Sequence, residues 1–235
     1  MNVGLRRLEG SPPGTPCRRK WMHPTSLERL ARQLADGLRS DHDAFCRELV
    51  RLLASGHPVT RERLATVLQM TAEQVAEVLA CLADLEVDHS GNVVGWGLTL
   101  IPTPHRFQVY GKPLYTWCAL DALTYPVLLN LPACVESSCP SSGTEVSLSV
   151  TPTGIRGLTP PGAVVSLVIP VQDQSCTCDR GSFCAQGHFF RSSRDAAVWQ
   201  GTRPGGRILS VEDAYRLGKL VVRYRYEGMT EHERT

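Results

Sequence analysis

The chain has 235 residues, with 25 basic and 23 acidic side chains, a formal net charge of +2 and 42% hydrophobic residues. This composition is typical of a folded protein with one large or two small domains. The longest largely apolar stretch, residues 115–131, contains Asp121 and Pro126, whereas a membrane span needs about 18 apolar residues. The first 24 residues contain no apolar core of a secretory signal. We therefore expect no membrane span and a cytoplasmic protein.

Residues 1–24 combine glycines and prolines with five basic side chains and one acidic one, and they show no apolar period. This pattern predicts a disordered basic tail. Leucines at helical spacing follow Ser26, which we expect to cap a first helix. An apolar stripe from Phe45 to Leu53 predicts a second helix that ends near Gly56.

Two short helices and a hairpin follow. The third helix is expected to begin at Thr60 and the fourth at Thr71, which forms a capping-box pattern with Gln74. A tight turn joins these helices, and the returning strand of the hairpin is expected at residues 96–100. Helices in this arrangement are typical of a winged helix. The sequence thus predicts a helical, winged-helix-like domain over residues 25–100.

Residues 101–235 show mainly strand patterns. Val146, Leu148 and Val150 alternate with polar residues, which predicts a strand with one buried face. The fold class predicted for the whole chain is α+β, with the cysteine-rich segment 173–187 as a long loop. The other expected elements are strands at 106–110, 134–138, 163–169 and 188–191 and helices at 119–129 and 211–226.

The nine cysteines are an odd number, so a full disulfide framework is excluded, and in a reducing compartment they favour metal binding or catalysis. Cys118 and Asp121 lie three residues apart where a strand runs into a helix. At this spacing their Cβ atoms would be about 5–6 Å apart on one helical face. Such a carboxyl group can exchange a proton with the thiol. The alternative is that Asp121 only caps the helix and Cys118 fills the core.

Cys176, Cys178 and Cys184 form a second group of thiols. A C-x-C spacing fits zinc poorly, but together with Cys118 or Cys139 these thiols could bind a soft, thiophilic metal. For Cys176 and Cys178 we favour an exposed loop pair that oxidises reversibly. The remaining cysteines are most simply small apolar side chains without a role in chemistry: Cys17, Cys46, Cys81 and Cys134.

Several other functions find little support. The second helix of the helix-turn-helix carries Glu73 and Glu77 but no Lys or Arg, so it would repel a DNA backbone. Glycine-rich nucleotide-binding motifs and a G-x-S-x-G elbow are absent. A thiol hydrolase using His105 or His188 lacks a supporting motif. The main alternative is a cytosolic, soft-metal-responsive winged-helix regulator; a structural zinc module would require tightly bound zinc.

At this point the chain resembles the organomercurial (alkylmercury) lyases over roughly residues 44–226. The most specific segments are residues 114–121 and residues 182–190. The resemblance implies an N-terminal winged-helix-like helical subdomain packed on a mixed β-sheet catalytic core with flanking helices, the core covering residues 101–235. Two further segments resemble the family, residues 58–60 and 91–100.

The resemblance also implies the chemistry. Cys118 and Cys184 would capture R–Hg⁺, and Asp121 would move a thiol proton to the leaving carbon, giving a hydrocarbon and Hg²⁺. The same three side chains would hold Hg²⁺ transiently. Cys139 matches a family cysteine that is structural. The implied role is mercury detoxification. No organic cofactor is expected, turnover is expected to need free cellular thiols, and Hg²⁺ is expected to pass to mercuric reductase. Neither nucleic acid nor a membrane is an expected partner.

Overall fold

The computed structural model describes residues 24–168, 183–203 and 205–227. The predicted basic tail, apart from its last residue, and most of the predicted cysteine-rich loop therefore lie outside the described residues. So do Cys17, Cys176 and Cys178.

Four helices build the N-terminal region. Thr60 and Thr71 cap the third and fourth helices, and Thr71 and Gln74 form both hydrogen bonds of the predicted capping box. The prediction for the first helix was wrong at its start, because the helix begins at Pro24 and not after Ser26. Proline suits a first turn, where no backbone N–H is needed. The helices are α1 (Pro24–Leu38), α2 (Asp43–Leu53), α3 (Arg61–Leu68) and α4 (Ala72–Cys81).

Three short strands follow the helices. The predicted strand at 96–100 is divided at Gly97, whose φ of 74° is left-handed and favours glycine. The returning strand of the wing is therefore the segment before this glycine, and the next strand turns back beside it. These strands are β1 (Glu86–Val87), β2 (Val93–Trp96) and β3 (Leu98–Thr99).

The wing strands continue directly into the main sheet. This sheet has eight strands in the order β1-β2-β3-β5-β4-β6-β7-β8, and a second sheet has the order β10-β9-β11. Every strand pair within the described residues is antiparallel, so the α+β class is confirmed but the expected mixed sheet is not. The further strands are β4 (His105–Val109), β5 (Lys112–Thr116), β6 (Ala133–Ser138), β7 (Glu145–Thr151), β8 (Gly154–Thr159), β9 (Val164–Val168), β10 (Phe189–Phe190) and β11 (Gly206–Ser210).

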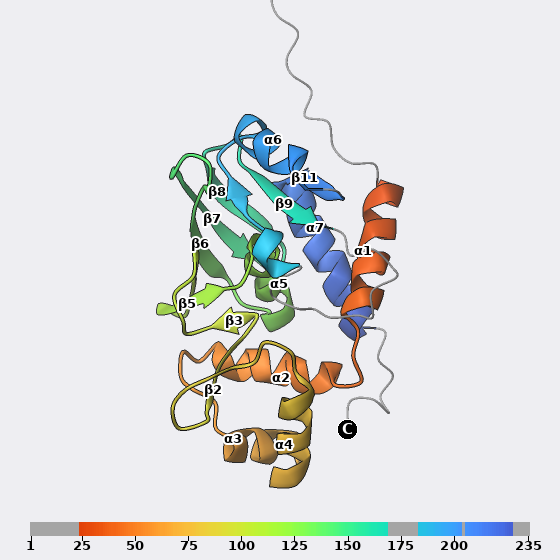
Figure 1. Ribbon diagram of the computed structural model, residues 1–235, viewed down its shortest axis with the longest axis vertical. Coiled ribbons are helices and arrows are strands. Elements are labelled where there is room, and N and C mark those ends of the chain that lie inside the picture. The colour runs from red at the N-terminus through yellow and green to blue at the C-terminus, as the bar shows by residue number, and fades with distance from the viewer. Residues whose placement is uncertain (1–23, 169–182, 204, 228–235) are drawn as a thin grey trace, which may run out of the picture.

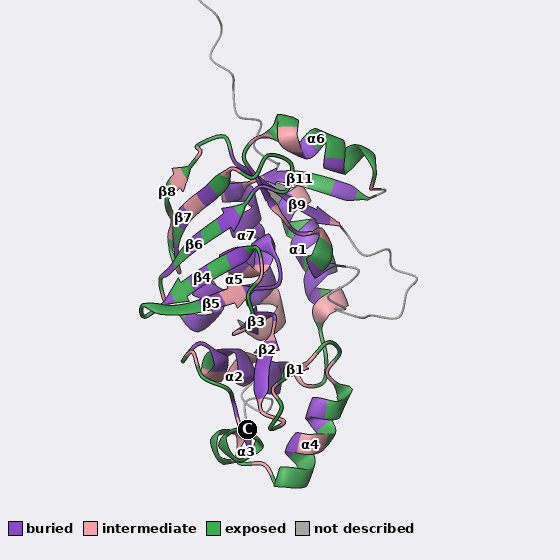
Figure 2. Ribbon diagram, turned by 60° about the vertical axis from the view of Figure 1, so that its left-hand side comes forward, coloured by how far each residue is buried: buried purple, intermediate pink, exposed green. Residues whose placement is uncertain are grey.

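Helices cover one face of the main sheet. Helix α5 packs on β4, β5 and β7, α7 packs on α5, and α1 lies along α7, although it is far from it in sequence (Figure 1). Buried and exposed residues alternate along β4, β6 and β7, because the other face of the sheet meets solvent (Figure 2). The C-terminal helices and short turns are α5 (Ala119–Leu129), α6 (Ser193–Gly201), α7 (Val211–Val222), η1 (Cys184–Gln186) and the π-helical turn η2 (Arg223–Glu227).

Three elements escaped the sequence patterns. Strand β8 contains two glycines and does not alternate in burial, α6 buries only two side chains, and β11 is recognised through its pairing with β9. None of them carries a strong local period. Among the described helices, none is long and apolar enough to cross a membrane.

A buried ion pair joins the N-terminal helices to the C-terminus. The Arg225 Nε donates to Oδ1 of Asp43 at 2.9 Å, and both side chains are less than 10% exposed. A second link is the hydrogen bond from Arg39 to the Tyr224 carbonyl at 3.1 Å. These contacts fix η2 against α1 and α2.

We predict that Asp43→Ala lowers the free energy of unfolding by about 3–5 kcal/mol, because it removes the carboxylate from a buried guanidinium. The matched control is Glu136→Gln in the exposed pair Arg106–Glu136, which should cost less than about 1 kcal/mol. Urea denaturation of both variants measures the difference. Equal losses would show that the Asp43–Arg225 pair does not stabilise this junction.

Candidate active site

Cys118 lies where strand β5 ends and helix α5 begins. Its backbone is extended, and its Sγ accepts a hydrogen bond from the Asp121 backbone N–H at 3.3 Å. Cys118 is therefore the N-cap of α5, and the alternative in which Asp121 caps the helix is wrong. The backbone on either side is also fixed, because the Thr116 hydroxyl donates to the Cys118 carbonyl and the Trp117 N–H donates to the Gly97 carbonyl.

Cys184 comes from a separate part of the chain. It begins the short turn η1, and its carbonyl accepts the N–H of Gly187 at 3.0 Å. The carbonyl of Gly187 in turn accepts the N–H of Ala119 at 2.9 Å, which ties this turn to the start of α5. A Cβ on Gly187 would lie only 2.9 Å from the Cβ of Cys118.

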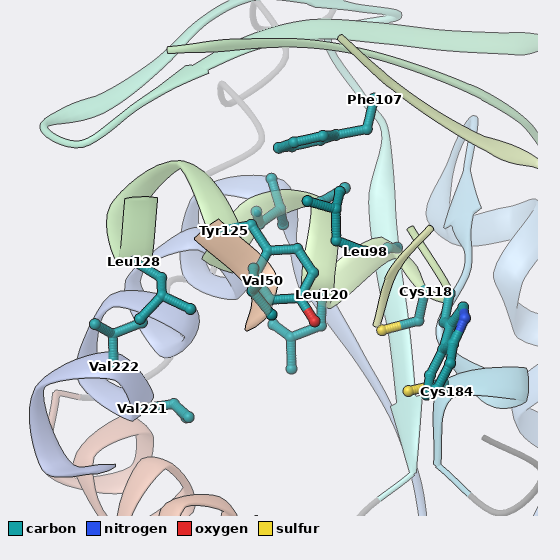
Figure 3. Close-up of a cluster of buried hydrophobic side chains, with 14 of the residues drawn as sticks. Val50, Leu98, Phe107, Cys118, Leu120, Tyr125, Leu128, Cys184, Val221 and Val222 are labelled. Carbon is teal, nitrogen blue, oxygen red and sulfur yellow. The ribbon is translucent and has the colours of Figure 1, made fainter. Parts of the chain in front are cut away.

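The structure thus brings the three predicted site residues together. The two sulfur atoms and a carboxylate oxygen of Asp121 all lie within 4.8 Å of one another, and the Cys184 thiol donates to Oδ2 of Asp121 at 3.8 Å. Cys118 is 1% exposed and Cys184 is 8% exposed. Figure 3 shows their sulfur atoms beside each other. Within the described ranges, this is the one group of three His, Cys, Asp or Glu side chains close enough to share a metal ion.

Burial dominates the acidity of these groups. It raises the pKa of Asp121 to about 6, although hydrogen bonds from both thiols and the charge of Arg225 act in the opposite direction. Burial also raises the pKa of the Cys118 thiol. As neutral hydrogen-bond donors, the two neighbouring thiols lower the pKa of Asp121, so burial alone accounts for its net rise.

A cavity of about 80 Å³ opens beside Asp121 and Cys184. Its wall is mostly apolar and is shared by the N-terminal helices, α5 and the C-terminal segment. Figure 3 shows Leu128, Val221 and Val222 at the end of the side-chain cluster opposite the two cysteines. Its lining includes the apolar side chains Leu38, Val50, Trp96, Trp117, Leu120, Leu128, Phe183, Val221 and Val222.

The polar residues of this wall were not predicted. Tyr125 lies one helical turn after Asp121 on the same face of α5, so the helical period could have indicated it. Burial raises the pKa of its phenol well above 10, which keeps the hydroxyl neutral. A side chain at Gly97 would overlap that hydroxyl. Arg225 reaches the cavity from η2, and no local pattern connects it with the cysteines.

The other candidate residues have structural surroundings. His105 is buried and hydrogen-bonds to Ser137 at 2.9 Å, and burial lowers its pKa to about 3. Burial also lowers the pKa of His188, which stacks near His105. Cys139 packs in a small separate cluster with Phe190, away from the two thiols. His105 and Cys139 are therefore buried parts of the core.

The other cysteines that the structure describes and the helix-turn-helix add no second site. Cys46 is buried in α2, while Cys81 and Cys134 are exposed. On α4, Glu73 and Glu77 are exposed, so the expected acidic surface of this helix is present. This surface lacks the positive charge that DNA binding requires.

The fold and the site define a class of protein in which a helix-turn-helix region and an antiparallel sheet are combined with two buried thiols and a carboxyl group. This set of donor atoms suits a soft metal. A family model described as alkylmercury lyase matches residues 98–223, and one described as the helix-turn-helix domain of alkylmercury lyase matches residues 27–97. The chain therefore belongs to the alkylmercury lyase family.

Individual relatives agree with this assignment. An alkylmercury lyase of Bacillus cereus is 48% identical over 175 residues, which cover 74% of this chain and 79% of that protein. One of Pseudomonas putida is 40% identical over 195 residues, covering 83% and 91%. The crystal structure of the mercury-bound form of MerB2 has a TM-score of 0.70 at 22% identity, over 86% of this chain and 99% of that one. This last likeness shows a shared fold.

The raised pKa of Asp121 predicts a pH-dependent stability. Between about pH 4 and 6 the folded protein retains a proton that the unfolded chain releases, so this group's contribution is complete below pH 4 and is lost as the pH rises through 6. The loss is at most about 3 kcal/mol, since one pKa unit corresponds to about 1.4 kcal/mol.

Urea unfolding of the wild-type protein and of Asp121→Asn, which stays neutral, at several pH values tests this expectation. The wild type should lose stability relative to the variant across this pH window and run parallel to it above pH 7. A constant difference would mean that the carboxyl group titrates normally.

Proposed function

We propose that Cys118, Cys184 and Asp121 carry out the reaction of this alkylmercury lyase, the protonolytic cleavage of the carbon–mercury bond of R–Hg⁺ to a hydrocarbon and Hg²⁺ in mercury detoxification. The observation that supports this assignment is the approach of both sulfur atoms and a carboxylate oxygen to within 4.8 Å of one another. Hg²⁺ is soft and thiophilic, so two thiolates are its natural protein ligands.

The first step is capture of the substrate, which enters as an adduct of R–Hg⁺ with a cellular thiol. Asp121 as a carboxylate removes a proton from a cysteine thiol, and the Cys184 S–H already points to it at 3.8 Å. The resulting thiolate bonds to mercury and displaces the carrier thiolate, which leaves with a proton. One thiol proton is thereby used and R remains on mercury.

The second step breaks the carbon–mercury bond. The other cysteine donates its sulfur electrons to mercury, and its proton passes through Asp121 to the carbon, which keeps the electron pair of the broken bond. The products are R–H and Hg²⁺ held by two thiolates. In total, two thiol protons are consumed, one by the carrier thiol and one by the hydrocarbon, so the reaction is balanced.

The surroundings of Asp121 suit this exchange. A carboxyl group with a pKa of about 6 gains and releases a proton near neutral pH more readily than an ordinary aspartate. The apolar cavity beside it can receive the organic group and keep water from the reacting carbon. Organic groups with an apolar surface are therefore the expected substrates.

Turnover requires removal of the product. We infer that no organic cofactor takes part, and that two free cellular thiols displace Hg²⁺ from the cysteines and restore both protons. Mercuric reductase is the proposed recipient of the metal, and the cytoplasm, where such thiols are abundant, is the proposed location. The regulator alternative is not favoured, because the exposed Glu73 and Glu77 oppose DNA binding.

Cysteine variants test the two-thiol assignment. We expect Cys118→Ala and Cys184→Ala each to abolish hydrocarbon release, because one protein sulfur activates the carbon insufficiently. Cys17→Ala, Cys46→Ala and Cys176→Ala serve as controls and should retain most of the activity. Gas chromatography of the hydrocarbon from phenylmercury with excess free thiol gives the rates. Activity in Cys184→Ala with loss in Cys178→Ala would move the second thiol to that residue.

Asp121→Asn separates proton transfer from metal capture. The variant keeps nearly the same side-chain volume and both thiols, so it should still bind Hg²⁺. Hydrocarbon release should fall by about 10²–10⁴, the usual effect of removing a positioned acid or base. Mercury stoichiometry, melting temperature and release are measured on one preparation. Retained release with a lowered melting temperature would show that Asp121 is only structural.

A further inference from the structure

The placement of Cys184 depends on one narrow contact. Cys118 and Cys184 lie 66 positions apart in the sequence, so no local structure sets the distance between their sulfur atoms. The turn that follows Cys184 approaches α5 at Gly187, where a Cβ would be 2.9 Å from the Cβ of Cys118 and 3.4 Å from its Sγ. Real Cβ atoms do not approach so closely without displacing their neighbours. Gly187 therefore sets how near the two thiols can lie.

Ser166, in the middle strand of the small sheet, holds both sides of this glycine. Its Oγ donates to the carbonyl of Gln186 at 2.8 Å and accepts the N–H of His188 at 3.0 Å. Its own N–H donates to the His188 carbonyl at 2.9 Å. The residue is fully buried, so water cannot take the place of these bonds. The Ser166 hydroxyl thus binds the residues on both sides of Gly187.

A second contact reinforces the same point. The Gly187 carbonyl also accepts the N–H of the residue that follows Cys118. This bond holds the turn against α5, and Ser166 joins the turn to strand β9 through a small side chain that can be shortened without opening a large cavity.

We propose that Ser166 is a positioning residue for the second thiol: its hydroxyl fixes the turn at Gly187 and thereby holds Cys184 at the distance from Cys118 at which both sulfurs share one mercury atom. The proposal rests on the two-thiol function described above. It assigns to Ser166 no contact with substrate, only control of the sulfur–sulfur separation.

The expected effect of removing this hydroxyl follows from its bonds. In Ser166→Ala, the buried Gln186 carbonyl and His188 N–H lose their shared partner, and such groups shift to find new ones. A displacement of about 1 Å of a reacting group can lower a rate by about 10². We therefore expect the kcat of hydrocarbon release to fall by about 10- to 100-fold, with a smaller change in KM.

Tyr215→Phe is a matched control. Tyr215 is also a buried residue, and its hydroxyl donates to two backbone carbonyls, those of Thr151 and Pro152 at 3.2 and 2.9 Å, outside the group formed by Cys118, Asp121 and Cys184. Both variants should lower the melting temperature to a similar degree. Because Ser166 is proposed to position Cys184, only Ser166→Ala should also change hydrocarbon release and Hg²⁺ retention.

The decisive measurement is retention of Hg²⁺ itself, which does not require cleavage. The protein is loaded with one equivalent of Hg²⁺ and titrated with a free thiol, and the metal released is measured. Ser166→Ala should lose Hg²⁺ at an about threefold lower thiol concentration than wild type, because one lost hydrogen bond changes the equilibrium constant about tenfold and two thiols displace each Hg²⁺. Tyr215→Phe should match wild type. Equal retention in both variants would overturn the proposal.

Gly187→Ala tests the same contact if Ser166→Ala fails to fold. Its backbone angles suit alanine, but the new Cβ must push the turn away from Cys118, so the same earlier loss of Hg²⁺ is expected. Unchanged retention would contradict a role for this contact. Failure of the proposed function has a different signature: the wild-type protein would then release no hydrocarbon, while the difference in Hg²⁺ retention between the variants would remain.

Discussion

The packing of Gly187 against Cys118 is the contact on which the site depends. It brings the short turn η1, which leads into strand β10 of the second sheet, onto the first turn of α5, and it leaves no room for a side chain between them. The hydrogen bond from the Ala119 N–H to the Gly187 carbonyl also fixes the orientation of the turn. Because the backbone segments that carry the two thiols are in direct contact, the short cysteine side chains are enough to bring both sulfur atoms together. In the proposed reaction, such pre-organisation lowers the entropic cost of capturing R–Hg⁺.

Burial determines the chemistry of the three groups. A thiol that caps a helix would ordinarily become more acidic, since the helix N-terminus favours negative charge. Burial opposes this effect and keeps the Cys118 thiol protonated, while the Asp121 carboxyl titrates close to neutral pH. The protons that the proposed reaction consumes are therefore stored on the protein before substrate arrives. Buried polar groups lower the stability of the fold, and such groups with shifted pKa values are typical of functional sites.

The N-terminal helices contribute to the active site as well as to the fold. Leu38 and Val50 line the cavity, and the wing strands extend the sheet that carries β5 and the start of α5. The buried pair between Asp43 and Arg225 holds the C-terminal turn η2 against these helices, so segments from the N-terminal and C-terminal parts of the described chain both line the cavity. The N-terminal region, whose exposed helix α4 is acidic, thus forms part of the wall of the cavity that we propose for the substrate.

The sequence by itself determined the features that depend on neighbouring residues: the caps of α3 and α4 at Thr60 and Thr71, the alternating strand β7, and a thiol and a carboxyl group on one face of α5. The resemblance of the motifs indicated Cys184. Only the tertiary structure decided that this thiol, rather than another position, lies beside Cys118, and that Cys118 caps the helix. It also revealed strand β8, which has no alternation of its own. Local patterns record which side chains share a face, whereas distances across 66 positions are set by packing and backbone pairing, which leave no periodic signal.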